Sequence, residues 1–324
     1  MRRRHALALL LLPGLAAAQA IDPRRRGSGP IRLIVPFAPG GGVDAAAQIL
    51  APPLADALGR AILIENRPGG HGIPGAEALM NAAPDGRSLG LTNTAPLGMA
   101  PLVDRPPYDS DRDFTHVALI AETPSVLLVP AGSRFADFAP WLHAAQSWRR
   151  GLTYGSPAVG SLQHLQGEML AKAADAQLAH IAYRGTGAAL QDLLNAQVDS
   201  LIAPLASVMP ALQAGRVRAL AVSSPGPEPL LPGIPSFAAL GYPQLTATAW
   251  TGLSGPKGLP GELVAQLNAT VNRIIARPQV AGELRAAGLT PPPHPLDAAA
   301  YRRLVMDFQQ AWRPVVEAAG MAAK

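Results

Sequence analysis

Short apolar runs alternate with helix-like patterns along most of this chain, and that alternation limits the fold more than any other feature. Residues 31–37 (IRLIVPF) read as a buried strand bounded by glycine and proline. The apolar side chains of residues 43–58 then recur at helical spacing, and residues 61–65 (AILIE) form the next predicted strand. The same order of strand, loop and helix continues to about residue 223. This order predicts an α/β fold in which helices cover parallel sheets.

Several element boundaries can also be predicted from local patterns. Pro52 and Pro53 lie inside the first helical pattern and lack the N–H that an interior turn needs, so we expect a kink or a restart there. Residues 116–121 and 125–130 read as two separate apolar runs. Two long amphipathic helices are expected near the carboxyl end of the chain.

Chain length points to two domains. The sequence has 324 residues, and a typical domain has about 150. Proline-rich stretches at residues 225–235 and 289–295 separate predicted elements, but no linker divides the chain into two sequential parts. We therefore expect two domains between which the chain crosses more than once.

The amino terminus has the pattern of a secretory signal peptide. Within residues 1–20, arginines at positions 2–4 precede an apolar run that ends in Ala-Gln-Ala, which predicts cleavage after Ala20. A membrane anchor is the alternative, but the run is broken by Pro13 and is shorter than the roughly 20 residues of a spanning helix. The arginine pair leaves twin-arginine export open beside the general secretory route.

Composition excludes several classes of function. There is no cysteine, so the chain has neither a disulfide, a thiol nucleophile nor a thiolate metal site. Its seven histidines show no metal-ligand spacing, and we expect neither a metal nor a cofactor. Charged residues make up 15% of the chain, and removal of the signal arginines lowers the net charge from +5 to +2 (5 − 3 = 2). This composition argues against a nucleic-acid-binding surface.

A glycine-rich loop joins the first predicted strand to the first predicted helix. Residues 36–42 (PFAPGGG, here called loop 1) would leave backbone N–H groups open at a positive helix terminus, which outlines an anion site. A nucleotide site is not favoured because the loop has no lysine, and a sharp turn that needs glycine is the purely structural alternative. Asp44 follows at the helix start, where we expect its carboxylate to orient the loop.

A second loop of this kind, residues 156–161 (SPAVGS, here called loop 2), follows a strand that ends near Tyr154. Ser156, Ser161 and His164 leave a secreted serine hydrolase as an alternative, although the loop lacks the GxSxG elbow. We expect His164 to be a buried histidine that is bonded to a nearby backbone group. Neither loop contains lysine or arginine, so a bound carboxylate would be held mainly by backbone N–H groups.

Six segments in order along the chain resemble signature segments of the substrate-binding proteins of tripartite tricarboxylate transporters, also called the Bug family. They are residues 31–44 (IRLIVPFAPGGGVD), 64–75 (IENRPGGHGIPG), 83–91 (APDGRSLGL), 154–165 (YGSPAVGSLQHL), 182–199 (AYRGTGAALQDLLNAQVD) and 215–223 (GRVRALAVS). The resemblance implies a periplasmic Venus-flytrap receptor with two doubly wound α/β domains and two hinge crossings. Domain I would comprise residues 27–123 and 249–324, and domain II residues 124–248.

The resemblance also implies the function and the partners. The protein would be a monomeric receptor, not an enzyme, that captures a small di- or tricarboxylate or related organic acid and delivers it to integral membrane permease subunits. A ligand sensor that docks on a membrane signalling protein is a further alternative.

The site residues carried over from the family's segments come from loops 1 and 2, from the helix start after each, from residues 92–95, which match a third loop near the cleft, and from position 203. They are Phe37, Ala38, Gly40, Gly41, Gly42, Asp44, Thr92, Thr94, Ser156, Gly160, Ser161, His164 and Ala203. The chain departs from the family pattern at Ala203 and Pro204, where aspartate and asparagine are common, so an amino-acid ligand is less expected. His71 replaces a residue that is commonly small, and Arg184 is the nearest basic candidate.

Overall fold

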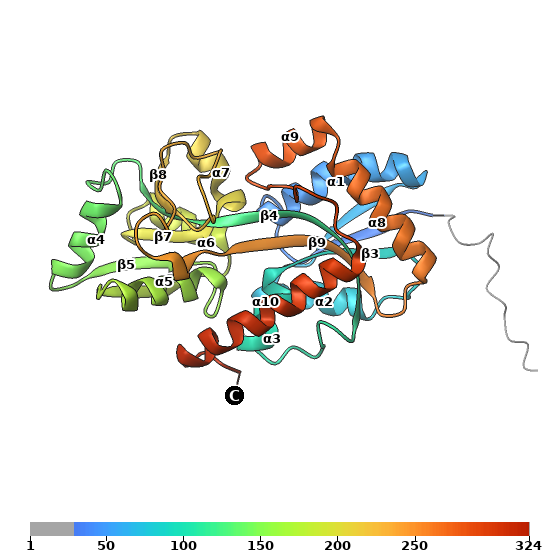
Figure 1. Cartoon of the computed structure of the whole chain (residues 1–324), viewed down its shortest axis with the longest axis horizontal. Helices are drawn as coiled ribbons and strands as arrows, with labels where there is room; N and C mark the ends of the chain where they lie inside the picture. The colour runs from blue at the N-terminus through green and yellow to red at the C-terminus, as the bar shows by residue number, and fades with distance from the viewer. Residues whose placement is uncertain (1–28, 324) are drawn as a thin grey trace, which may run out of the picture.

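The structure is a computed structural model that describes residues 29–323, so the predicted signal segment, residues 1–20, lies outside the described residues. Strands and helices alternate along the described chain, which confirms the α/β prediction (Figure 1). No helix among residues 29–323 is both long and apolar enough to cross a bilayer.

The strands, in chain order, are β1 (Ile31–Val35), β2 (Ile62–Asn66), β3 (Ser88–Asn93), β4 (Phe114–Pro130), β5 (Leu152–Ser156), β6 (Leu178–Ala182), β7 (Ser200–Pro204), β8 (Val217–Val222) and β9 (Thr248–Pro256). The helices are α1 (Gly42–Leu58), α2 (Ile73–Met80), α3 (Ala100–Val103), α4 (Phe138–Ser147), α5 (Leu162–Ala173), α6 (Thr186–Leu194), α7 (Leu205–Gln213), α8 (Gly261–Ile275), α9 (Pro278–Ala286) and α10 (Ala298–Ala318). Short irregular turns are η2 (Gly70–Gly72), η3 (Thr94–Met99) and η4 (Pro243–Leu245).

Two groups of strands share one long strand. The first sheet has the order β2-β1-β3-β9-β4, and the second pairs β6, β5, β7, β4 and β8. Strand β4 runs through both, and β9 pairs with it antiparallel on the way back (Figure 1). We call each sheet with its helices a half of the molecule. Thr123 and Ala249, the predicted boundary residues, pair with each other in this crossover, and we propose that the strand pair is a hinge between two domains.

The strand directions bring the two glycine loops to the boundary between the halves. β1 is parallel to β3, and both run in the direction of β4, because β9 is antiparallel to β3 and to β4. In the second half β5 is parallel to β7, which is antiparallel to β4. The carboxyl ends of β1 and β5 therefore point toward each other's half, and loops 1 and 2 begin at those ends.

Both sheets are covered by helices on both faces. In the first half α1, α8 and α9 pack on one face and α2 and α10 on the other. In the second half α4 and α5 cover one face and α6 and α7 the other. A further apolar cluster joins the halves, because Met99 and Leu102 pack with Leu162 and Leu165 at the start of α5.

The structure corrects two local expectations. Helix α1 is continuous through Pro52 and Pro53, so of the two alternatives, a kink or a restart, the restart does not occur. Leu50 and Leu54 are buried on the sheet and hold the helix through the missing N–H donors. The two apolar runs between residues 116 and 130 form the single strand β4.

Candidate functional site

Each glycine loop touches an element of the opposite half. A Cβ atom added at Gly42 would lie 2.7 Å from the Cβ of Ala206, so the amino-terminal ends of α1 and α7 are in close contact. A Cβ atom added at Gly160 would lie 2.9 Å from the Cβ of Val103 in α3. Glycine is needed at both positions for the two halves to approach this closely.

Asp44 organises loop 1 from inside. Its carboxylate is buried and accepts hydrogen bonds from the backbone N–H of Gly40 (3.0 Å) and from the side-chain amide of Asn66 (2.9 Å). The same amide donates to the carbonyl oxygen of Phe37 at 3.0 Å. Phe37 is half-buried and Ala38 is exposed. Asp44 therefore orients the loop, as the sequence predicted.

The amino terminus of α1 keeps its N–H groups open. Gly41 is the N-cap residue and supplies no side-chain cap. Ala45 donates its N–H to the Gly41 carbonyl oxygen at 2.9 Å, whereas the N–H groups of residues 41–44 find no acceptor within the described part of the chain. Such a helix end carries partial positive charge and four free donors, the arrangement that binds anions in proteins.

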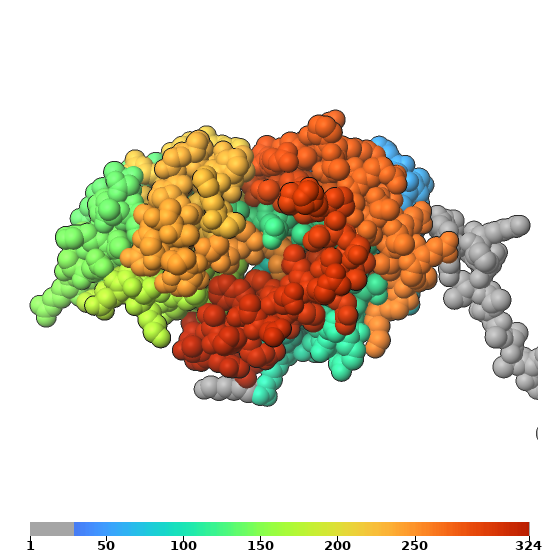
Figure 2. All heavy atoms as spheres, viewed as in Figure 1, coloured from blue at the N-terminus to red at the C-terminus, as the bar shows by residue number. Residues whose placement is uncertain are grey.

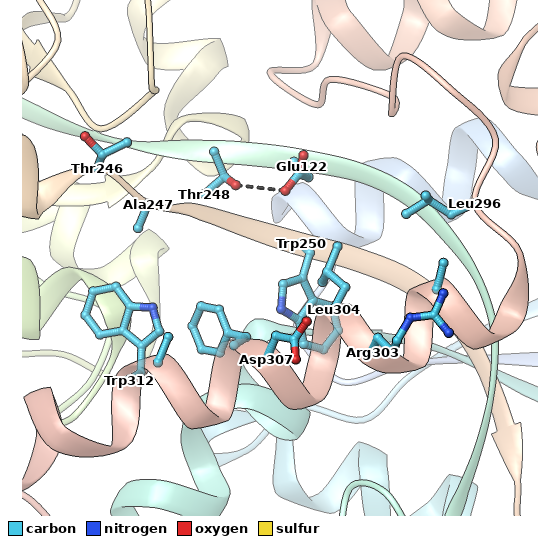
Figure 3. A pocket seen from close by; sticks show the side chains of 13 residues that line it. Glu122, Thr246, Ala247, Thr248, Trp250, Leu296, Arg303, Leu304, Asp307 and Trp312 are labelled. Atoms are coloured by element: carbon cyan, nitrogen blue, oxygen red, sulfur yellow. Dashed lines mark hydrogen bonds between the residues drawn. The ribbon is translucent and has the colours of Figure 1, made fainter.

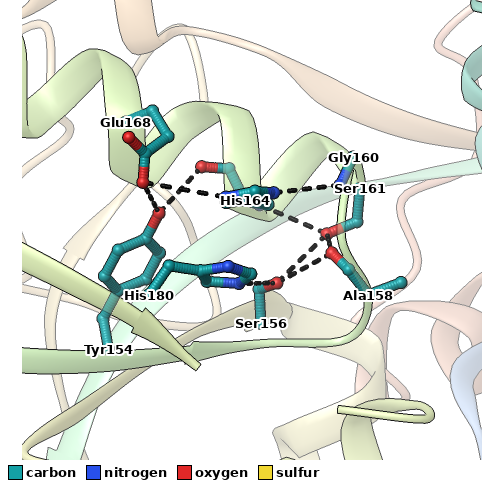
Figure 4. A network of polar contacts seen from close by, with 8 residues as sticks. All are labelled: Tyr154, Ser156, Ala158, Gly160, Ser161, His164, Glu168 and His180. Atoms are coloured by element: carbon teal, nitrogen blue, oxygen red, sulfur yellow. Dashed lines mark hydrogen bonds and ion pairs between the residues drawn. The ribbon is translucent and has the colours of Figure 1, made fainter. Parts of the chain in front are cut away.

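The amino terminus of α5 differs because it has a side-chain cap (Figure 4). The Ser161 hydroxyl accepts the N–H of His164 at 3.2 Å and donates to the carbonyl oxygen of Ala158 at 2.8 Å. Nδ1 of His164 accepts the N–H of Gly160 at 2.9 Å. His164 is thus a buried histidine bonded to backbone, as expected, and the two loops are not equivalent as anion sites.

Ser156 is paired with a histidine that the sequence analysis did not select. Its hydroxyl lies 2.7 Å from Nε2 of His180, and the His180 ring stacks on His164 with centroids 3.5 Å apart (Figure 4). The register explains the pairing, because β6 lies beside β5 with His180 opposite Tyr154. The available signal was that His180 belongs to the apolar run that follows β5 and the helix after it.

Burial makes both stacked histidines poor bases. It lowers the pKa of His164 to about 4. It also lowers the pKa of His180 to about 4, with a smaller contribution from the neighbouring His164. A base with so low a pKa activates a serine weakly at neutral pH, and Ser156 is fully buried. This geometry argues against the hydrolase alternative.

The stacked pair predicts that stability falls in mild acid. In the unfolded chain these histidines take up protons near pH 6.5, whereas in the folded protein they do so only near pH 4. Between these values the unfolded state binds more protons, so the free energy of unfolding falls as the pH drops from 6.5 to 4. Urea unfolding at pH 7.5 and 4.5 measures the loss. The variant with both His164→Gln and His180→Gln should show a smaller loss than His143→Gln, which changes an exposed histidine; equal losses would contradict the prediction.

Three predicted site residues make hydrogen bonds or apolar contacts inside the fold. The Thr92 hydroxyl lies 2.7 Å from that of Ser254, and the Thr94 hydroxyl accepts the N–H of Trp250 at 2.8 Å. Ala203 is fully buried in an apolar cluster of the second half. The structure therefore gives Thr92, Thr94 and Ala203 packing and hydrogen-bonding partners within the protein.

One large pocket, the α10 groove, contains none of the predicted site residues. It has a volume of about 560 Å³ and lies between the crossover strands and α10, where Figure 2 shows a hollow. Glu122 accepts a hydrogen bond from Thr248 there, and Arg303 and Asp307 line the α10 side (Figure 3). Strand side chains alternate, so Thr123 points to the opposite face, where it accepts the N–H of Ala206 at the start of α7. Loop 1 is therefore on the other face of the crossover strands β4 and β9.

A second pocket, of about 530 Å³, lies between the halves and includes Gly160 of loop 2. His71 and Arg184, whose position relative to the site the sequence left open, both line it. Within residues 29–323 no three His, Asp or Glu side chains gather in a group that could hold a metal ion.

Comparison with known proteins shows that the chain is similar to the members of one family. A model of the tripartite tricarboxylate transporter family receptor matches residues 46–321. The chain is 38% identical over 293 residues to a protein from the tcbD-tcbE intergenic region of a Pseudomonas species, covering 89% of this chain and 86% of that one. It is 31% identical over 315 residues to Protein BugT of Bordetella pertussis, covering 96% and 95% of the two chains.

Solved structures agree with this result. A Rhodopseudomonas palustris protein solved with adipate is 30% identical, has a TM-score of 0.86 and covers 92% of this chain and 99% of its own. MatC of the same organism, solved with bound malate, is 31% identical, has a TM-score of 0.81 and covers 89% and 99%.

Proposed function

The chain belongs to the tripartite tricarboxylate transporter receptor family, and we propose that it captures a small carboxylated solute between loops 1 and 2 and delivers it, as a monomer, to the permease subunits of such a transporter. Members of this family are periplasmic solute receptors rather than enzymes. Delivery to a permease, and not to a membrane signalling protein, is proposed only because the chain belongs to this family.

The observation that carries the proposal is the open amino terminus of α1. Four N–H groups, at residues 41–44, converge there without an acceptor among the described residues, and Asp44, which could have capped them, is turned back to Gly40 and Asn66. The carboxyl ends of β1 and β5 direct both loops to the boundary between the halves. A carboxylate bound at this helix end would complete the four missing hydrogen bonds.

Relatives support a small organic acid as the solute. The two similar R. palustris proteins were solved with adipate and with malate, both dicarboxylates. Because neither loop contains lysine or arginine, the first carboxylate would be held by backbone donors and helix dipole. Uncharged donors of this kind recognise the carboxylate group itself and leave the rest of the solute to other side chains.

We expect adipate, malate or a related acid to stabilise the protein against unfolding. A ligand that binds only the folded state adds about 2.7 kcal/mol when its concentration is a hundredfold above Kd. Thermal unfolding of the mature protein with each acid, and with the matching diamide as an uncharged control, measures this gain. Stabilisation by the acids alone supports the proposal. No stabilisation by any acid, together with ester hydrolysis that disappears in Ser156→Ala, would favour the hydrolase alternative.

A further inference from the structure

The pocket beside loop 2 is built from both halves. From the first half it is lined by η2 and by the end of α3, and from the second by loop 2 and by the segment after β6. It shares Gly160 with loop 2, and Gly72, next to His71, packs on loop 1, because an added Cβ there would lie 3.0 Å from Cβ of Pro36 and 3.4 Å from Cζ of Phe37. Two of its side chains, His71 and Arg184, are not explained by the fold or by capture of a single carboxylate.

His71 has an unusual backbone conformation and an unsatisfied ring nitrogen. Its φ of +49° lies in the left-handed region, which side chains other than glycine seldom adopt and which is often found at functional sites. Nδ1 lies 2.5 Å from the Asp104 carboxylate, and because a carboxylate can only accept, Nδ1 carries a proton. The side chain is 9% exposed, and its Nε2 is buried with no partner in the described structure.

This arrangement prepares the ring for a ligand. Asp104 fixes the orientation of the imidazole by accepting the hydrogen bond of Nδ1. With Nδ1 occupied, Nε2 is the nitrogen left to bond an incoming group, and when protonated it is a donor to an anion. Leaving a buried ring nitrogen without a partner is unfavourable, so a group that satisfies it gains free energy.

Arg184 brings an unpaired cation to the same pocket. Its guanidinium is exposed, and no carboxylate among residues 29–323 lies within ion-pair distance of it. The turn that carries it is fixed, because Tyr183 and Gly185 donate their N–H groups to the carbonyl oxygens of Ser156 and Pro157 (3.1 and 2.9 Å). The pocket therefore has one acidic side chain, Asp104, which is already paired, and one arginine free to bind an anion.

We propose that His71 and Arg184 form a subsite for the second carboxylate of a dicarboxylic acid whose first carboxylate binds at α1. The inference rests on the proposed function and adds the class of solute to it. His71 comes from the first half and Arg184 from the second, so a dicarboxylate bound in this way contacts both halves. The subsite explains why His71 occupies a backbone position with positive φ, which glycine would adopt more readily.

The test compares a dicarboxylate with its half-amide, which has the same length and one carboxylate. Calorimetry gives Kd for adipate and adipic monoamide, and for malate and its monoamide, with the wild-type protein, His71→Gly and Arg184→Ala. Charge-assisted hydrogen bonds predict that the wild type binds at least one diacid about tenfold or more tightly than its half-amide. Each variant should lower that ratio to roughly threefold or less while Kd for the half-amide changes by less than about twofold.

The two control variants make the same kinds of change, a glycine at a position with positive φ and the loss of an exposed arginine, at residues outside this pocket. His71→Gly suits the left-handed backbone, so it should fold, and Ala196→Gly makes the same backbone change at another residue with positive φ. Arg285→Ala removes an exposed arginine from α9. Both controls should keep the wild-type ratio. An unchanged ratio in His71→Gly and Arg184→Ala, or an equal loss for diacid and half-amide, would overturn the subsite alone. Failure of the wild type to bind any of these acids would overturn the proposed function as well.

Discussion

Replacing Gly41 with valine is expected to weaken carboxylate binding by two orders of magnitude or more while the protein stays folded. Gly41 has φ −83° and ψ 168°, an extended conformation that valine adopts readily. An added Cβ would have no atom closer than the Ala38 carbonyl oxygen at 3.7 Å. The side chain of an N-cap residue lies over the first-turn N–H groups, so the valine methyl groups would block the donors proposed to hold the carboxylate.

Calorimetry with the acid that stabilises the wild type most measures the loss, and thermal unfolding shows whether the fold survives. Gly41→Asp is a second variant, because its carboxylate would cap α1 and compete with the solute while raising stability by only about a few tenths of a kcal/mol. Gly40→Val is the contrasting control: Gly40 has φ +86°, so valine there is strained and should lower stability itself. Two results together would contradict the backbone site: normal binding by Gly41→Val, and loss of binding of both mono- and diacids in Arg184→Ala. They would show that an arginine holds the carboxylate instead.

Much of the fold could be predicted because its determinants are local. The strand predicted at residues 61–65 is found at Ile62–Asn66, and the helix after loop 1 ends at Leu58, before Gly59 in the left-handed C-cap conformation. The role of Asp44 followed from its position in the first turn of a helix. Each of these depends on neighbours within a few residues.

The site was harder to predict because it depends on contacts between distant segments. Ser156 is paired with His180 only because β5 and β6 adopt a particular register. The two glycine loops have similar sequences, yet α1 is open and α5 is capped, since Ser161 stands where α1 has Gly41. His71 required the structure, because its left-handed backbone and its contact with Asp104 across 33 positions leave no local pattern.

Replacing Gly167 with alanine is expected to destabilise the protein by about 2–4 kcal/mol, from overpacking and a lost buried hydrogen bond. In an ordinary helix this change would stabilise by about 1 kcal/mol. Here the added Cβ would lie about 2.2 Å from Cε2 of Tyr154. That ring is fully buried, and its hydroxyl donates to Glu168 (2.7 Å) and to the His164 carbonyl oxygen (3.1 Å). Urea unfolding measures the change, and carboxylate binding should weaken because α5 positions loop 2.

A double-mutant cycle separates this clash from any intrinsic effect on the helix. Tyr154→Leu should itself destabilise the protein by removing a buried ring, but in that background Gly167→Ala should become neutral or stabilising, a coupling of about 2 kcal/mol or more. Tyr154→Phe keeps the ring atoms Cε2 and Cζ that the new methyl group would meet at 2.2 and 2.3 Å, so it should not rescue Gly167→Ala. If Gly167→Ala stabilised the wild type, the Tyr154 ring would be able to move away from the new methyl group. That result would contradict the prediction that Tyr154 is tightly packed against α5.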